Sequence, residues 1–243
     1  MARLTGPRQA QRRGAKPKQL VVLLHGYGAD GNDLIGLAPY LQRVLPDAAF
    51  VAPNGPEPCG MSPMGRQWFA IDIDDPSRMS RDPHAAVRRF AGMGERADRV
   101  LPLVNAFLDE ELARAGLTDA DLALVGFSQG TMLSLHTGLR RPAPPAGIVG
   151  FSGALLGGET IHQHVRHPVP VTLIHGDTDD LVPPLAMYDA AGALGRAGLP
   201  VQFHVSPGTG HSIAMDGIEL AGRFLVDVFA GRWAVRPPVA SAL

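Results

Sequence analysis

The chain has 243 residues, a formal net charge of −1 and 45% hydrophobic residues. A nearly neutral chain has no global electrostatic reason to bind nucleic acid, and no apolar run reaches the roughly 18 residues of a membrane span. The length fits a single domain that buries a full core. Cys59 is the only cysteine, which excludes an internal disulfide framework and favours a cytoplasmic protein.

The first 18 residues depart from this balance. They contain six basic residues and no acidic one: Arg3, Arg8, Arg12, Arg13, Lys16 and Lys18. They lack the apolar segment of a secretory signal, and a basic arm for nucleic acid or membrane is one interpretation. We favour a solvated, disordered tail over 1–18, a second loose end over 232–243, and one domain over 19–231.

Apolar runs and turn residues predict strands that alternate with helices. The expected strands cover 19–24, 48–53, 122–125, 146–151, 169–174 and 201–205, and a long loop rich in Gly and Pro covers 54–75. The expected helices cover about 32–45, 83–115 (kinked or broken near Pro102), 131–137, 184–197 and 213–229. Most strands are apolar on both faces, which predicts a mainly parallel sheet between helices, with sites at the carboxyl ends of its strands.

Residues 126–130 read Gly-Phe-Ser-Gln-Gly between a predicted strand and a predicted helix. This arrangement is typical of a nucleophile elbow, whose glycines leave room where a Cβ would collide. It would expose the Ser128 hydroxyl and point the backbone N–H of Gln129 at a developing oxyanion. Ser152 also follows a strand, but the Leu-Leu-Gly-Gly run at 155–158 breaks any helix after it. We therefore expect Ser152 in the wall of the site.

A serine nucleophile needs a base and an acid. His211 lies in a glycine-rich loop between the last strand and the last helix, and Asp177, Asp179 and Asp180 follow the strand before it. Ser128, Asp179 and His211 then occur in the order nucleophile, acid, base that α/β-hydrolases use. Asp177 or Asp180 could instead cap the next helix, and a divalent-cation site at these acids is a weaker alternative.

Two other patterns compete with this hypothesis. Residues 26–31 match the Gly-x-Gly-x-x-Gly of dinucleotide sites, but the next strand ends in Asn54 rather than in an acidic residue. We favour a tight turn whose Tyr27 backbone N–H is the second oxyanion donor. The histidines in His162-x-His164-x-x-His167 have metal-like spacing without a carboxylate in their own run, so we expect an exposed loop and no metal.

Four segments resemble, in register, the phospholipase/carboxylesterase family of α/β-hydrolases, which includes small bacterial carboxylesterases and acyl-protein thioesterases. They are residues 24–28, 126–130, 175–183 and 210–212, and the resemblance extends from about 20 to about 229. It implies an α/β-hydrolase fold with Ser128 as nucleophile, Asp179 as acid, His211 as base, and the Tyr27 and Gln129 amides as oxyanion hole. It also implies that Trp68 and Phe69 shape substrate access and that Leu181 lines the acyl pocket. Asp180 stands where the family often has proline, which leaves it as a rival to Asp179.

The resemblance implies a serine carboxylesterase that hydrolyses short- to medium-chain esters through an acyl-serine intermediate. The expected partner is a small-molecule ester, with no metal or cofactor. A thioesterase or lysophospholipase for longer acyl chains is the alternative, and a non-catalytic binding module is the rival of another class. Apolar residues on the long loop would allow a homodimer.

Overall fold

The computed structural model describes residues 3–60, 64–71, 90 and 92–233. Seven strands form the main sheet, in the spatial order β1-β3-β2-β6-β7-β8-β9. Their bounds are β1 Arg8–Gln9, β2 Gln19–Leu24, β3 Ala48–Val51, β6 Leu122–Phe127, β7 Gly147–Phe151, β8 Val171–Gly176 and β9 Val201–Ser206. All neighbours are parallel except β1, which runs antiparallel to β3. The predicted mainly parallel sheet is confirmed.

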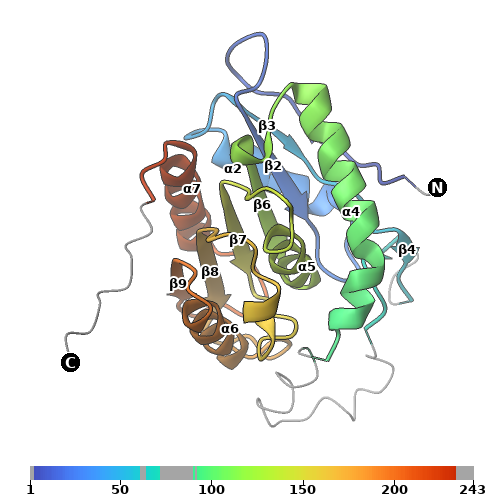
Figure 1. Cartoon of the computed structure of the whole chain (residues 1–243), viewed down its shortest axis with the longest axis vertical. Helices are drawn as coiled ribbons and strands as arrows, with labels where there is room; N and C mark the ends of the chain where they lie inside the picture. The colour runs from blue at the N-terminus through green and yellow to red at the C-terminus, as the bar shows by residue number, and fades with distance from the viewer. Residues whose placement is uncertain (1–2, 61–63, 72–89, 91, 234–243) are drawn as a thin grey trace.

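Helices cover both faces of this sheet (Figure 1). One face packs on α4 Gly94–Ala115, α5 Gln129–Gly138 and α6 Leu185–Arg196. The other packs on α1 Gly31–Leu34, η1 Ile35–Leu37, α2 Ala38–Leu41 and α7 Met215–Phe229. Side chains of β2 alternate between the two faces. Leu20, Val22 and Leu24 enter the core beneath α4, α5 and α6, whereas Val21 and Leu23 enter the core beneath α1, α2 and α7. A strand buried on both faces must be apolar throughout, which explains why these strands read as continuous hydrophobic runs.

The prediction of a disordered tail over residues 1–18 is wrong for the part that the structure describes, residues 3–18. Arg8 and Gln9 pair with Phe50 and Val51 and cover the edge of β3 that would otherwise be open. The Arg8 guanidinium lies 2.6 Å from a carboxylate oxygen of Glu111, a buried residue of α4. A buried carboxylate needs a counter-ion, so this pair ties the N-terminal segment to the body.

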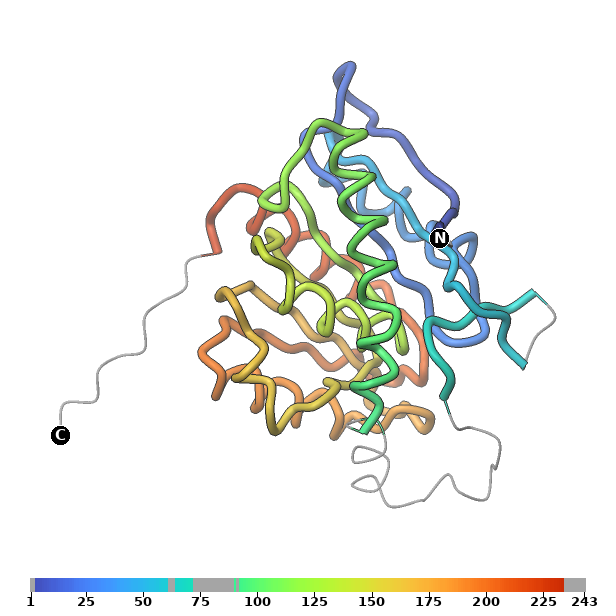
Figure 2. The backbone as a smooth tube through the Cα atoms, turned by 45° about the vertical axis from the view of Figure 1, so that its right-hand side comes forward, coloured from blue at the N-terminus to red at the C-terminus, as the bar shows by residue number. Residues whose placement is uncertain are grey.

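Two further basic residues of this segment also pair with acids. Arg3 contacts Glu110 at 2.7 Å and Lys18 contacts Asp47 at 3.0 Å. Figure 2 shows the N-terminal segment beside α4, where the first of these pairs and the Arg8 pair form. At the other end, Trp233 packs edge-on against Phe224 with ring centroids 5.0 Å apart, so the domain extends two residues into the predicted C-terminal tail.

Two predicted helices differ from the observed ones. The single helix expected over 32–45 is three short pieces that end at Leu41, with a proline inside α2. In contrast, α4 is continuous from Gly94 to Ala115 through Pro102, where we predicted a kink or break. The first residues of that predicted helix lie outside the described residues.

Two short segments, β4 Glu57–Pro58 and β5 Arg66–Gln67, form a separate antiparallel pair within the long loop. In the described part of the chain, no helix is long and apolar enough to cross a membrane.

Candidate active site

Ser128, Asp179 and His211 follow three strands of the same parallel sheet. Ser128 comes directly after β6, Asp179 lies three residues beyond the end of β8, and His211 lies in the loop between β9 and α7. Parallel strands place their carboxyl ends at one edge, so residues far apart in the sequence meet there.

The turn at Ser128 has the strained geometry of an elbow. Ser128 adopts φ 53° and ψ −115°, a conformation that L-residues seldom occupy, and its N–H donates to the Phe151 carbonyl at 2.9 Å. A Cβ on Gly126 would overlap the Gly130 carbonyl, and one on Gly130 would overlap the Leu24 carbonyl. The predicted need for glycine at both positions is confirmed, because backbone from β2, β6 and α5 meets there without room for a methyl group.

Asp179 is the acid that meets the imidazole. Its Oδ2 lies 2.7 Å from Nδ1 of His211, and its Oδ1 accepts the backbone N–H groups of Leu181 at 3.0 Å and Val182 at 2.9 Å. Asp177 and Asp180 are both exposed, and Asp177 accepts the N–H of Thr209 instead. Of the three candidate acids, only Asp179 is buried against His211.

A second histidine, His175 at the end of β8, also contacts this carboxylate. Its Nε2 lies 2.7 Å from the Val182 carbonyl oxygen and 3.2 Å from Oδ2 of Asp179. A carbonyl only accepts, so Nε2 carries the proton and donates to both oxygens. Burial alone would raise the pKa of Asp179, but the hydrogen bonds from His175, His211 and the Val182 N–H outweigh it and hold that pKa well below its usual range.

The sequence analysis did not identify the contact of His175 with Asp179. Its position four residues before Asp179, at the end of the same strand, was the only available signal.

The loop that carries His211 is held from several sides. The His211 ring packs against the ring of Phe127, the residue directly before Ser128, with ring centroids 4.9 Å apart. Gly176 has no room for a Cβ because the carbonyl groups of Thr209 and Gly210 lie against it. The orientation of the imidazole therefore depends on contacts with the ends of both β6 and β8.

The turn that carries Tyr27 lies beside the serine. A Cβ built on Gly26 would be 3.4 Å from the Cβ of Ser128. The next residues are pinned to β5, since Gly28 N–H donates to the Arg66 carbonyl at 2.9 Å. The backbone N–H groups of Tyr27 and Gln129 thus belong to two segments that flank Ser128, as the oxyanion-hole hypothesis requires.

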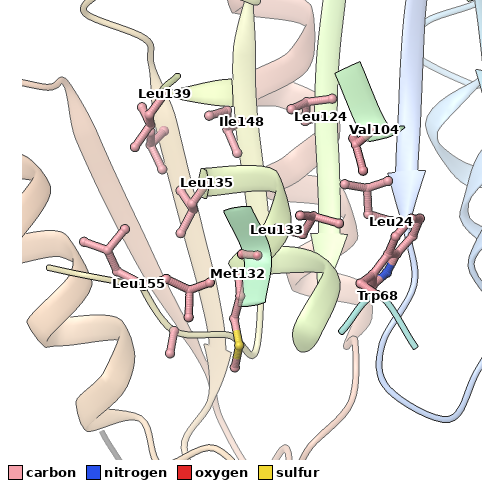
Figure 3. Close-up of a cluster of buried hydrophobic side chains, with 14 of the residues drawn as sticks. Leu24, Trp68, Val104, Leu124, Met132, Leu133, Leu135, Leu139, Ile148 and Leu155 are labelled. Carbon is pink, nitrogen blue, oxygen red and sulfur yellow. The ribbon is translucent and has the colours of Figure 1, made fainter. Parts of the chain in front are cut away.

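The role predicted for Trp68 and Phe69 at the substrate entrance does not agree with their burial. Trp68 is 1% exposed and Phe69 is 3% exposed. The Trp68 side chain lies in the apolar core beside Leu24 (Figure 3), and its indole N–H donates to the His25 carbonyl at 2.9 Å. Both residues are core residues in this structure. Leu181, next to Asp179, is half exposed and remains the candidate for a substrate contact.

The competing patterns have structural uses. Asp30 accepts the N–H groups of Asn32 and Asp33 and so occupies the helix N-terminus that a dinucleotide phosphate would need. Ser152 is buried and in a left-handed conformation, with its N–H bonded to the Ile174 carbonyl. His167 contacts the Pro142 carbonyl at 2.8 Å. Within the described ranges, no three His, Cys, Asp or Glu side chains are grouped to hold a metal ion.

Comparisons with known proteins agree with this geometry. The sequence profile described as Phospholipase/Carboxylesterase matches residues 8–228. The chain is 25% identical over 205 residues to the esterase YpfH of Escherichia coli, which covers 84% of this chain and 80% of that protein. It is 28% identical over 221 residues to acyl-protein thioesterase 1 of Saccharomyces cerevisiae, which covers 86% of this chain and 92% of that protein.

Among solved structures, the esterase PE8 is 40% identical and superimposes with a TM-score of 0.82, covering 93% of this chain and all of that one. Proteins described as esterases and thioesterases are hydrolases, and the resemblance that the sequence motifs indicated is confirmed. The chain belongs to the phospholipase/carboxylesterase family and is an α/β-hydrolase-fold enzyme.

Proposed function

We propose that this protein is a serine carboxylesterase that hydrolyses short- to medium-chain esters through an acyl-serine intermediate. The observation that carries the proposal is the hydrogen bond of 2.7 Å between buried Asp179 and His211, at the sheet edge where Ser128 occupies a strained elbow. Such strain is retained where the surrounding structure enforces it, and it clusters at functional sites. The similarity to esterases supports ester hydrolysis in general.

In the proposed reaction, Nε2 of His211 accepts the Ser128 proton while Oγ attacks the ester carbonyl. Asp179 bonds to Nδ1, which keeps Nε2 free of a proton and stabilises the imidazolium that forms. The carbonyl oxygen becomes negative and is bound by the backbone N–H groups of Tyr27 and Gln129. His211 then protonates the departing alcohol, and a water molecule activated by the same imidazole releases the acid from Ser128.

The preference for short acyl chains belongs to the same proposal, with Leu181 beside the triad acid as the acyl contact. Thioester or lysophospholipid hydrolysis is the second candidate, and the similarity to an acyl-protein thioesterase favours it. A series of p-nitrophenyl esters from acetate to palmitate, together with palmitoyl-coenzyme A, separates the two. A maximum of kcat/KM at long chains would replace the first candidate with the second.

Covalent labelling tests the serine mechanism directly. A fluorophosphonate should add one label per chain at Ser128, found by peptide mass spectrometry, and should abolish ester hydrolysis in parallel. Ser128→Ala should lose the label and on the order of 10⁶ in turnover. Ser152→Ala is the matched control, because Ser152 is buried. This variant should be labelled at Ser128 to the same extent as the unmodified protein. Normal turnover in Ser128→Ala would contradict the proposal.

A further inference from the structure

The two expected oxyanion donors lie in segments that follow different strands, Tyr27 after β2 and Gln129 after β6, and Trp68 contacts both segments. Its backbone N–H donates to Oε1 of the Gln129 side chain at 3.0 Å, and its indole N–H donates to the His25 carbonyl at 2.9 Å. The partners lie 61 and 43 residues away along the chain. Trp68 therefore joins the start of α5 to the turn after β2 through two directional bonds.

The Gln129 side chain makes the first half of this bridge specific. It is fully buried and donates from Nε2 to the Phe69 carbonyl at 2.7 Å, in addition to its bond from Trp68. The Gln129 side-chain amide therefore bonds to the Trp68 N–H and to the Phe69 carbonyl, which holds these two residues at both ends. Gln129 thus contributes its backbone N–H to the proposed oxyanion hole and its side chain to the segment behind it.

The second half reaches the Tyr27 N–H through His25. The His25 ring packs against the Trp68 ring at 5.0 Å, and its Nε2 accepts the Gly55 N–H at 2.8 Å. The ring proton is therefore on Nδ1, which donates to the Gly26 carbonyl at 2.8 Å. Burial lowers the pKa of His25, which keeps the ring neutral in this tautomer.

The carbonyl of Gly26 and the N–H of Tyr27 belong to one planar peptide group. A bond that fixes the direction of the carbonyl also fixes the opposite direction of the N–H. Trp68 holds the preceding peptide by the His25 carbonyl, and His25 holds this one. Two consecutive peptides of the turn are thereby oriented from the Trp68 side.

We propose that Trp68 is a positioning residue that keeps the two halves of the oxyanion hole in register, through Gln129 on one side and His25 on the other. This inference rests on the proposed function. It assigns the indole, which is buried and bonded to the His25 carbonyl, an indirect role in transition-state binding. A displacement of about 1 Å in such a site costs up to about 100-fold in rate.

The test removes the indole N–H and keeps the ring. Replacing Trp68 with β-(3-benzothienyl)alanine puts sulfur in place of N–H in a ring of the same shape. Trp68→Phe is the encoded counterpart, which removes the N–H together with part of the ring system. We expect kcat for p-nitrophenyl butyrate to fall about 10- to 100-fold with KM within about threefold. The inhibition constant of a trifluoromethyl ketone, which forms an oxyanion on the serine, should weaken in the same proportion.

Trp233→Phe is the control, because the second tryptophan packs on the outer helix α7 rather than at the site. It should keep kcat and inhibitor affinity within about twofold. Gln129→Met, which keeps the backbone N–H and the side-chain length, should reproduce the loss from the other end of the bridge. Thermal melting shows whether each variant is folded.

Folded Trp68 variants that keep both kcat and inhibitor affinity within about threefold would overturn the inference. So would a loss confined to KM or to melting temperature. Such results leave fluorophosphonate labelling of Ser128 intact, so they refute the bridge without refuting the hydrolase mechanism. If Ser128 is not labelled in the unmodified protein, the proposed function fails first.

Discussion

Asp179→Asn is the substitution whose effect the hydrogen bonds define most sharply. Oδ1 accepts two backbone N–H groups, from Leu181 and Val182, so the amide oxygen must take that place. The amide NH₂ then faces His211 and His175. In the unsubstituted protein, Oδ2 of Asp179 occupies this position and accepts a hydrogen bond from each imidazole. The opposite flip would aim the NH₂ at the two backbone N–H groups. Neither orientation satisfies the site.

His175 cannot relieve the conflict, since its Nε2 proton is fixed by the Val182 carbonyl at 2.7 Å. His211 can relieve it only by moving its proton from Nδ1 to Nε2, and an imidazole in that tautomer cannot accept the Ser128 proton. The equivalent exchange in a serine protease lowers kcat about 10⁴-fold. At 1.36 kcal/mol per tenfold this is about 5.5 kcal/mol of barrier, and we expect a loss of that order here.

The assay is kcat for p-nitrophenyl acetate at pH 7.5, with burst kinetics to isolate acylation. Asp180→Asn is the matched control: it removes the exposed neighbouring carboxylate that the sequence left as a rival, and it should keep kcat within about twofold. More than about 10% of normal kcat in Asp179→Asn would refute the tautomer argument. An equal loss in Asp180→Asn would show that the wrong acid was assigned.

Three further predictions follow from single contacts. His175→Met should lower kcat about 10- to 100-fold, because it removes the N–H that contacts Asp179. His175→Gln keeps an N–H near the Nε2 position and should recover most of the lost kcat. Equal kcat and equal pH–rate profiles in the two variants would contradict a role of His175 in holding Asp179. Burial, reinforced by the nearby Arg140 charge, lowers the pKa of His136 to about 4 despite its bond to Asp98, from an ordinary 6.5. The unfolded chain therefore takes up a proton first as pH falls, and between about pH 6.5 and 4 the free energy of unfolding should drop by about 3 kcal/mol. Urea titrations should show this drop flattened in His136→Gln; an unchanged pH dependence would refute the assignment. Gly130→Ala should destabilise by more than about 3 kcal/mol because the new methyl overlaps the Leu24 carbonyl, whereas Gly195→Ala, in α6 with open space around it, should stabilise by about 0.5–1 kcal/mol. Thermal melts check this pair, and a similar effect of both substitutions would show that the overlap does not decide the outcome.

The sheet and the strand ends that carry Ser128, Asp179 and His211 could be predicted from the sequence alone. The reason is that each of these features is local. Continuous apolar runs specify strands buried on both faces, and the glycines flanking Ser128 specify the tight turn. Once the strands are parallel, the residues that follow them must share one edge. Ser128, Asp179 and His211 each follow one of these strands, so the sequence predicts all three at that edge.

The contacts of Arg8, Trp68 and His175 could not be predicted in this way, because they depend on how the chain packs. Arg8 looked like part of a solvated tail because its partner Glu111 lies 103 residues away, inside α4. The family resemblance implied that Trp68 shapes substrate access, and nothing in the sequence indicated its burial, because that burial depends on β2 and α4 packing around it. His175 and Asp179 are close in sequence, but their contact depends on how the loop folds back so that the Val182 carbonyl meets the ring. Burial and hydrogen-bond partners are properties of the packed chain, and a single sequence does not carry the distances that set them.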